Sequence, residues 1–343
     1  MTAPLVVVDA DVLGRHRTGD ETYVLNLLRE LGQLDSGLRI AAVTRQPELV
    51  PDGIEPLTLA TPVQEARMLW SLPRLLRRTG AALVHTQYAL PFRVPCPSVV
   101  TIHDLSFERE PALMSRKDRI VFRRVVPRAA RRAARVLTVS ERTKADLVEL
   151  YGLPEAKVVV TPNGVDPAFT PSCSEQLSRY ALAVGAVQPR KNQLAALAAA
   201  QAAGLPLVVA GPVKDGPLAV ELRAGGADLR GYVTQPELVE LYRGAACLVQ
   251  PSRYEGFGLP VLEAMACGTP VVALDEPALR EVAGDAAVFV DEAGLADGVR
   301  RALAERERLV AAGLARAALF SWRAAAERTL AVYREALRHG DRA

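Results

Sequence analysis

The chain has 343 residues, 50% of them hydrophobic, and its 42 Lys and Arg exceed its 39 Asp and Glu by only three. At roughly 150 residues per domain, this length predicts two domains, and the apolar content excludes a disordered chain. The near balance of charge excludes a general nucleic-acid coat. The four cysteines lie far apart without the spacing of metal ligands, which predicts reduced thiols in a cytoplasmic protein.

No secretory leader or membrane-spanning segment is expected. The first apolar run ends at Asp9 and is too short for a leader. The longest apolar stretch, residues 194–213, contains Gly204 and Pro206, so it divides better into a helix, a turn and a strand than into a spanning helix.

The first half of the chain alternates short apolar runs with longer amphipathic ones. Because the short runs are continuously apolar, they predict strands of a parallel sheet covered on both faces. Ser140 is placed to cap the helix that follows it. The expected strands cover residues 5–9, 38–43, 82–85, 98–103, 135–139 and 158–161, and the expected helices cover 21–31, 64–78, 115–134 and 141–151.

The same alternation restarts after a segment rich in Pro, Ser and Thr, residues 161–174, where we place an interdomain linker. Two doubly wound α/β domains in tandem predict a ligand cleft between them, outside the carboxyl ends of the strands. A last helix, residues 321–337, carries Trp322 and Tyr333 on apolar positions and must therefore dock. The expected strands of this half cover residues 180–184, 207–210, 229–232, 247–249, 270–273 and 287–290.

The densest chemical signal is QPSRYEGFGLPVLE, residues 250–263, which follows an expected strand. Its two glycines make a tight loop before Pro260, a residue that suits the first position of a helix. The backbone N–H groups of residues 256–259 would then point out of a helix start, where the helix dipole favours phosphate. Glu255 and Glu263 can face the same ligand, and a carboxylate that accepts two hydrogen bonds suits the vicinal hydroxyls of a ribose.

Two other interpretations of this segment stay open. The glycines could make only a turn, with Glu263 as a solvated helix residue. Glu255 and Glu263 could also be the acid and the nucleophile of a glycosidase, although a glycine loop suits a phosphate better than a water pocket.

The second signal is VGAVQPRKN, residues 184–192, which predicts another strand, turn and helix start. The adjacent cations Arg190 and Lys191 oppose the helix dipole unless an anion joins them. An anion held between this turn and the Gly256 loop would resolve the conflict. The alternative is an exposed cation pair on a solvated turn.

These segments resemble the signature of glycosyltransferase family 4, retaining sugar transferases with the GT-B fold. The resemblance lies in the two glutamates within PSRYEGFGLPVLEAMACGTPVVA and in VGAVQPRKN, VTPNGVDPAF, VVTIHDLSF and the opening DADVLGRHRTGDETYVLNLL. It runs from Val8 to Tyr333 and implies two Rossmann-like, doubly wound parallel-sheet domains with an interdomain cleft. Residues 1–163 would form the acceptor-side domain and residues 164–320 the donor domain, with residues 321–343 packing back on the first.

The resemblance also implies a nucleotide-sugar site in the second domain. Glu263 would bind the ribose hydroxyls and Glu255 the hydroxyls of the donor sugar. Arg190 and Lys191 would hold the phosphates. The backbone of Gly256, Phe257, Gly258, Leu259 and, at the base, Val233 would supply the remaining donor contacts.

Residues of the first domain would complete the site. His103, which follows a strand, would lie beside the reacting sugar, so that His103, Lys191 and Glu255 are the expected catalytic residues. Gly19 and Asp20 would lie in a loop where the acceptor approaches. The alternatives are a structural imidazole satisfied by backbone for His103 and a simple turn for Gly19.

No metal or other cofactor is expected, because fixed cations and a helix start can stabilise the leaving diphosphate. Asp9-Ala10-Asp11 spells the D-x-D of metal-dependent sugar transferases, but it ends the first strand, far in sequence from the donor loop, and we interpret it as a strand-end feature. Many family members carry an arginine where this chain has Ala186, so phosphate neutralisation would depend more on Lys191 and Arg190.

Residues 119–135 carry arginines opposite an apolar stripe at helical spacing. They predict either an exposed helix face, broken at Pro127, or a peripheral surface for anionic lipid at the inner face of a membrane.

We therefore expect a retaining glycosyltransferase that moves a hexose, for example mannose from GDP-mannose or a sugar from a UDP-sugar, onto a glycan or a lipid-linked acceptor. The alternatives are a non-catalytic nucleotide-sugar binder and another GT-B enzyme such as a 2-epimerase or a phosphorylase. A dinucleotide-dependent dehydrogenase is disfavoured, because no G-x-G-x-x-G follows the first strand.

Overall fold

The computed structural model describes residues 3–15, 18–111, 116–172 and 180–340, and the chain separates into two compact units. Unit 1 comprises Met1–Glu108, Met114–Gly164 and Trp322–Ala343, and unit 2 comprises Arg109–Leu113 and Val165–Ser321. The chain thus leaves unit 1 after Gly164 and returns to it at Trp322.

Unit 1 is built on a seven-stranded parallel sheet in the order β3-β2-β1-β4-β5-β6-β7. β1 pairs with both β2 and β4, so the strand order reverses between β1 and β4. Every residue of β1 is buried, as expected for a parallel sheet covered on both faces. The strands are β1 Leu5–Asp9, β2 Arg39–Thr44, β3 Glu55–Thr58, β4 Leu83–Gln87, β5 Ser98–Ile102, β6 Arg135–Thr138 and β7 Val158–Val160.

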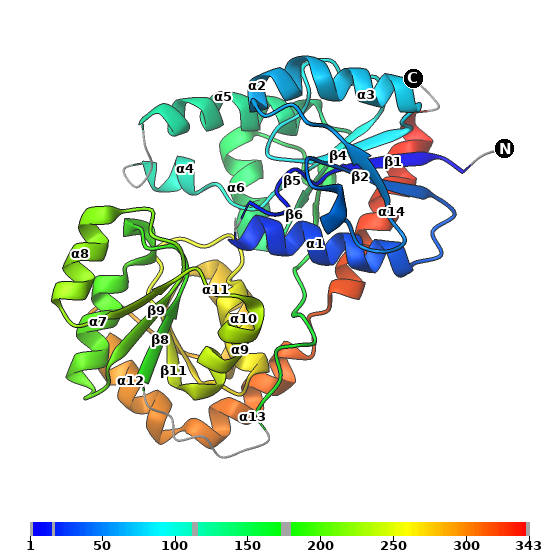
Figure 1. Ribbon diagram of the computed structural model, residues 1–343. Coiled ribbons are helices and arrows are strands. Elements are labelled where there is room, and N and C mark those ends of the chain that lie inside the picture. The colour runs from blue at the N-terminus through cyan, green and yellow to red at the C-terminus, as the bar shows by residue number, and fades with distance from the viewer. Residues whose placement is uncertain (1–2, 16–17, 112–115, 173–179, 341–343) are drawn as a thin grey trace. The chain divides into compact units, whose positions relative to one another are not determined.

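Helices cover both faces of this sheet (Figure 1). α3, α5 and α6 pack on one face through two clusters of buried apolar side chains, and α1 and α14 lie together on the other. Ser140 caps α6 as predicted, because its hydroxyl accepts a hydrogen bond from the Thr143 N–H at 3.1 Å. The helices are α1 Thr18–Gln33, α2 Gln64–Ala66, α3 Leu72–Thr79, α4 Ser106–Arg109, α5 Arg116–Arg132, α6 Glu141–Tyr151 and α14 Trp322–Gly340, with 3₁₀ turns η1 Pro47–Leu49 and η4 Glu155–Lys157.

Three expectations for unit 1 were wrong in detail. The edge strand β3 was not predicted, because it is mostly exposed and carries Pro56 and therefore lacks a continuous apolar run. The helix expected over 64–78 is interrupted between α2 and α3 by a π-helical turn, η2 Arg67–Ser71. Pro127 does not break α5, whose residues Val126 and Ala129 are buried in the core on either side of it.

Unit 2 is built on a six-stranded parallel sheet in the order β10-β9-β8-β11-β12-β13, with the reversal between β8 and β11. α7, α8 and α12 contribute to one large apolar cluster on one face (Figure 1). The strands are β8 Tyr180–Val184, β9 Leu207–Ala210, β10 Asp228–Gly231, β11 Ala245–Gln250, β12 Val271–Leu274 and β13 Val288–Val290. The helices are α7 Gln193–Ala202, α8 Gly216–Ala224, α9 Gln235–Gly244, α10 Leu259–Ala266, α11 Pro277–Ala283, α12 Leu295–Ala304 and α13 Arg306–Ala317, with 3₁₀ turns η5 Pro189–Lys191 and η6 Gly284–Ala286.

One stretch of the chain, Arg306–Arg338, is long and apolar enough to cross a membrane by length and composition alone. The structure divides it into α13 and α14, and α14 buries the apolar side chains of Leu330 and Tyr333 inside unit 1. The Tyr333 hydroxyl also lies 2.6 Å from Nδ1 of the buried His85. The composition of this stretch is therefore explained by packing within the protein, and it is weak support for a membrane span.

Candidate functional site

Two loops of unit 2 start from neighbouring strands at the reversal of the strand order. β8 leads into the turn that carries Arg190 and Lys191, and β11 leads into the loop that carries Glu255. The carboxyl ends of parallel strands share one edge of a sheet, and the reversal point of a doubly wound sheet is where ligands bind in such folds. The topology therefore brings together two motifs that are more than sixty residues apart in sequence.

The buried carboxylate of Glu255 joins these two loops. Its Oε1 accepts hydrogen bonds from Lys191 Nζ at 2.5 Å and from Gln250 Nε2 at 2.8 Å, and its Oε2 lies 3.3 Å from Arg190 Nη1. Arg190 also donates to the Tyr254 carbonyl at 2.6 Å, which ties the turn to the loop at a second point. The cations and the carboxylate therefore form one ion-pair cluster.

This cluster fixes the charge of Glu255. Burial acts to raise its pKa, but the positive charges of Lys191 and Arg190 and the hydrogen bonds outweigh burial and hold the pKa at about 2. The carboxylate is therefore ionised at neutral pH and is shared by two cations.

The prediction that Arg190 and Lys191 begin a helix and oppose its dipole is wrong in this detail. Arg190 and Lys191 lie in η5, and Asn192, in the left-handed conformation with φ 53°, separates them from α7. Glu255 itself supplies the anion that neutralises them in part. The alternative of an exposed cation pair is also wrong, because both side chains are mostly buried.

The glycine loop after Glu255 ends in the start of α10. Gly258 is the N-cap residue with φ 108°, and a Cβ atom there would come within 2.7 Å of Leu279 Cδ2, so both the backbone and the space require glycine. The first helical bonds run from the Val261 and Leu262 N–H groups to the Gly258 carbonyl. The N–H of Leu259 precedes these bonds, which makes this helix start a suitable place for an anion.

Glu263 lies one turn further along α10 and is also buried, rather than solvated. It accepts a hydrogen bond from the Tyr242 hydroxyl of α9 at 2.8 Å. Burial raises its pKa to about 7; the bond from Tyr242 acts to lower it, and the negative charge of Asp166 acts to raise it. Glu263 can therefore change its charge near neutral pH.

Two glycines, Gly185 and Gly211, allow the loops after β8 and β9 to lie close together. Gly211 follows β9 with φ 148°, and a Cβ atom there would lie 2.1 Å from the Gly185 carbonyl oxygen, so the loops after β8 and β9 are pressed together. The stem of Lys191 lies against Gly185. Val233, the residue expected at the base, is half-buried in the loop that follows β10.

In unit 1, His103 follows β5 at the carboxyl edge of the sheet and is buried. Its ring lies edge-on to Tyr23, with centroids 4.6 Å apart, and its Nε2 has no hydrogen-bond partner among the residues that the structure describes. Burial lowers its pKa, although Asp20 and Asp104 act to raise it, so the imidazole is neutral at neutral pH. A ring nitrogen without a partner disagrees with an imidazole satisfied by backbone.

Gly19 and Asp20 lie in the first turn of α1, not in a loop as predicted. A Cβ atom at Gly19 would meet nothing within 4 Å, so neither a turn nor close packing requires glycine there. Asp20 lies near enough to His103 to influence its pKa. The structure therefore brings the predicted residues Asp20 and His103 close together within unit 1.

The D-x-D segment is held by arginines. Both carboxylate oxygens of Asp9 accept hydrogen bonds at 2.7 Å from Arg67, which is fully buried in η2. Asp11 pairs with Arg45 at 3.0 Å and with Arg15. Among the described residues, no group of three or more His, Cys, Asp or Glu is arranged to hold a metal ion.

Sequence reasoning missed several residues of these sites. Gln250 lies within the recognised segment but was given no role, whereas Tyr242 and Asp166 reach Glu263 from other elements. Arg67 was predicted only as part of a helix. Partners that lie far away in sequence leave no local pattern, so only the fold could identify them.

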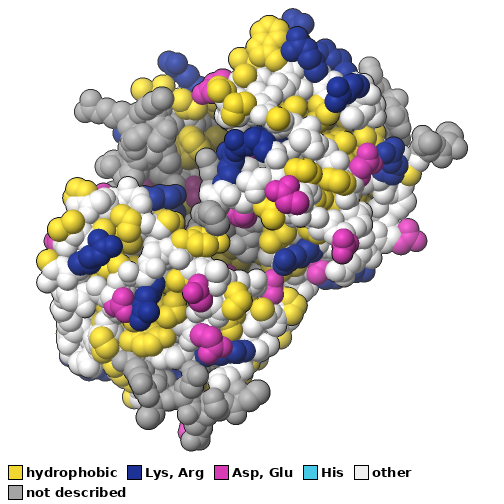
Figure 2. Space-filling view, in the orientation of Figure 1, with side chains coloured by type: hydrophobic (Ala, Val, Ile, Leu, Met, Phe, Trp, Pro, Cys, Tyr) yellow, Lys and Arg dark blue, Asp and Glu magenta, His cyan; other side chains and the backbone are white. Residues whose placement is uncertain are grey.

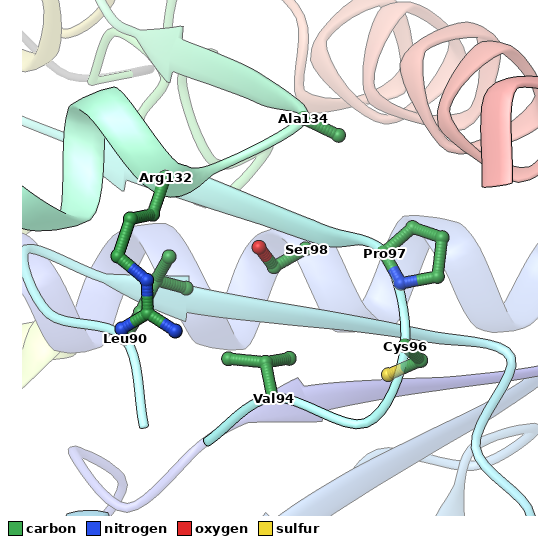
Figure 3. Close-up of a pocket in the computed structure, with 7 residues that line it drawn as sticks. All are labelled: Leu90, Val94, Cys96, Pro97, Ser98, Arg132 and Ala134. Atoms are coloured by element: carbon green, nitrogen blue, oxygen red, sulfur yellow. The ribbon is translucent and has the colours of Figure 1, made fainter. Parts of the chain in front are cut away.

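A pocket of about 220 Å³ opens in unit 1 near Ser98, at the opposite end of β5 from His103 (Figure 3). Arg132, Val94 and Cys96 are among its lining residues, and it contains none of the predicted site residues.

The sequence model of the family Glycosyltransferase Family 4 matches residues 17–169, and that of Glycosyl transferases group 1 matches residues 174–315. The chain is 32% identical over 329 residues to O-antigen chain mannosyltransferase B of Escherichia coli, an alignment that covers 87% of this chain and 83% of the relative. It is 29% identical to a D-inositol 3-phosphate glycosyltransferase of Kineococcus radiotolerans, over 97% of this chain and 95% of the relative.

A similar fold is found among solved structures. The sucrose-phosphate synthase of Thermosynechococcus elongatus superposes with a TM-score of 0.77 over 97% of this chain and 98% of that one, at 22% identity. This likeness and the two parallel sheets confirm the predicted GT-B fold.

Proposed function

The chain belongs to glycosyltransferase family 4, and we propose that it transfers a hexose, with retention of configuration, from a nucleoside-diphosphate sugar bound in unit 2. The observation that carries the proposal is the ion-pair cluster of Glu255, Lys191 and Arg190 beside the start of α10. Two neighbouring cations and a helix start at the reversal of the strand order suit the diphosphate of such a donor.

The reaction breaks the bond between the anomeric carbon and the phosphate oxygen and forms a bond from that carbon to an acceptor hydroxyl, whose proton is lost. The barrier depends on the negative charge that develops on the leaving diphosphate. Lys191 and Arg190 are held in place by Glu255 before any ligand arrives, so they stabilise that charge without reorganising. We propose that no metal is needed for this stabilisation.

Glu263 is proposed to accept hydrogen bonds from the ribose hydroxyls, and Glu255 to contact the hexose. The buried position of Glu263 on the helix that starts at the glycine loop supports this assignment. The backbone of Gly256, Phe257, Gly258, Leu259 and Val233 would supply the other donor contacts. From unit 1 we propose that His103, neutral and with Nε2 available, contacts the sugar, and that Gly19 and Asp20 lie on the acceptor side.

For the donor we propose GDP-mannose, with a UDP-sugar as the second choice, and for the acceptor a glycan or a lipid-linked glycan. The support is the relative named O-antigen chain mannosyltransferase, which spans most of this chain. The three free cysteines among the described residues, Cys96, Cys247 and Cys267, support a cytoplasmic location.

A panel of GDP-, UDP- and ADP-sugars tests the donor by thermal unfolding, since a ligand that binds only the native state raises the melting temperature. We expect GDP-mannose to raise it in the wild-type chain and to raise it less in Glu263→Ala. The matched control is Glu221→Ala, which removes an exposed side chain of α8 and should respond as the wild type does. A panel without any shift would refute donor binding, and binding without transfer or donor hydrolysis would indicate a non-catalytic binder.

A further inference from the structure

Unit 1 exposes several large apolar side chains. Trp70 in η2 is 60% exposed, and Phe92, in the loop between β4 and β5, is 50% exposed. Leu69 and Val121 are each close to half exposed. Single exposed apolar side chains are common, but a group of them on one surface indicates something that the surface binds.

Direct contacts link the segments that carry Trp70 and Phe92 and add arginines to them. The Phe92 N–H donates to the Met68 carbonyl at 3.2 Å, so the loop lies against η2. Arg74 lies over the Trp70 ring, 5.4 Å from its centroid, and Arg128 of α5 lies over the Phe92 ring at 5.6 Å. Both flanking elements, α3 and α5, cover the same face of the sheet.

We call this the aromatic–arginine surface. These contacts place Trp70, Arg74, Phe92, Arg128 and Arg132 in it, and Leu69 is the neighbour of Trp70 in η2. Val121 and Arg124 belong to it because they lie two turns and one turn before Arg128 on the same side of α5. Arg132 belongs to it because its Nη2 donates to the Phe92 carbonyl at 3.1 Å. Figure 2 shows apolar and basic side chains next to each other over α3, at the top of the view.

The aromatic–arginine surface is positively charged, although the chain as a whole is nearly neutral. Segments 67–79, 88–97 and 119–132 contain no Asp or Glu. Seven exposed arginines of these segments form no ion pair with a carboxylate that the structure describes; they are Arg74, Arg77, Arg78, Arg93, Arg124, Arg128 and Arg132. Their charge is thus available to an external anion.

The predicted basic segment 119–135 contributes only in part. Arg123 pairs with Glu108 at 2.6 Å and Arg131 donates to the Tyr151 carbonyl, so these two face the other side of α5. Arg135 lies in β6 and pairs with Glu335 of α14. Only part of the predicted segment therefore belongs to the aromatic–arginine surface, and η2, α3 and the Phe92 loop contribute the rest.

We propose that the aromatic–arginine surface docks on the surface of an anionic phospholipid bilayer. Guanidinium groups bind phosphate oxygens and are attracted by the negative potential of anionic lipids. Tryptophan, whose apolar ring carries a polar N–H, is enriched at the level of the headgroups, and phenylalanine adds an apolar ring that can enter the same region. An anionic bilayer is favoured because its negative headgroups complement the arginines that have no described carboxylate partner, and because the exposed aromatic rings can enter the membrane interface. The surface is separate from the donor-binding residues, so this proposal does not depend on the proposed function.

Vesicle sedimentation tests the proposal with the full chain. We expect the protein to pellet with phosphatidylcholine vesicles that contain phosphatidylglycerol, to stay in solution with phosphatidylcholine alone, and to be released by salt. The double variant Arg74→Ala/Arg128→Ala should lower the partition coefficient by about tenfold or more, since each cation near the membrane adds to the attraction. The matched control, Arg223→Ala/Arg328→Ala, removes two other exposed arginines and should bind as the wild type does.

Tryptophan fluorescence gives a second readout. The chain has two tryptophans, and Trp322 is only 4% exposed, so a blue shift on adding anionic vesicles should come from Trp70. The shift should vanish in Trp70→Phe and persist in Trp322→Phe. Pelleting that is absent, insensitive to salt or equally reduced in the control variant would overturn the proposal. Binding of a protein or a polyanion without any binding to anionic vesicles would overturn it as well.

Discussion

Two buried glutamates eight positions apart in unit 2 experience opposite environments. Glu255, in the loop before α10, is surrounded by donors and cations that hold its pKa at about 2. Glu263, inside α10, has a single hydroxyl donor and a nearby carboxylate, and burial raises its pKa to about 7. Equal residue type and similar burial therefore do not determine the charge of a side chain; the partners that other elements contribute determine it.

The largest effect should come from removing the charge of Glu255. Glu255→Gln leaves Lys191 and Arg190 mostly buried without their anion, and breaking such a cluster costs about 3 kcal/mol or more of unfolding free energy. Chemical denaturation of the ligand-free protein measures this cost. The control is Glu292→Gln at an exposed ion pair, which should cost less than about 1 kcal/mol. Equal costs for the two variants would contradict a special role of the cluster.

The pH dependence of stability should separate the two glutamates. The folded-state pKa of Glu263 is raised from 4.5 to about 7, so its contribution is full below pH 4.5 and is lost as the pH rises towards 7, by about 3 kcal/mol. The pKa of Glu255 is depressed to about 2, so its contribution is present above pH 4.5 and is lost as the pH falls towards 2.

Denaturation of Glu263→Gln between pH 4.5 and 7 checks this. The variant should flatten the stability profile in that window and leave the acid limb below pH 4.5 unchanged. An unchanged slope in the variant would show that Glu263 is ionised throughout, as Glu255 is.

The third effect concerns turnover. If Lys191 stabilises the leaving phosphate, Lys191→Ala should reduce kcat by about 100-fold or more. Lys214→Ala removes an exposed lysine of the same unit and should leave kcat unchanged. Steady-state transfer from GDP-mannose measures both. A near-normal kcat in Lys191→Ala would show that other groups stabilise the leaving phosphate. The ion-pair cluster of Glu255 would then matter for the stability of the fold and not for turnover.

The sequence by itself determined the family, the two doubly wound sheets, most strands of both units and the cap at Ser140. It could do so because continuous apolar runs, helix caps and glycine loops are local patterns that burial and backbone geometry impose directly. It also identified Glu255, Glu263, Arg190 and Lys191, because they lie in two dense segments.

Only the tertiary structure decided how these residues are charged and paired. In the sequence Arg67 is one residue of a predicted helix, and only the fold shows that it binds Asp9. Tyr242 and Asp166 act on Glu263 from other segments, and no motif in the sequence links them to it. The aromatic–arginine surface likewise joins three segments that are separate in sequence. Electrostatics and exposure depend on distance in space, and a sequence pattern reports only distance along the chain.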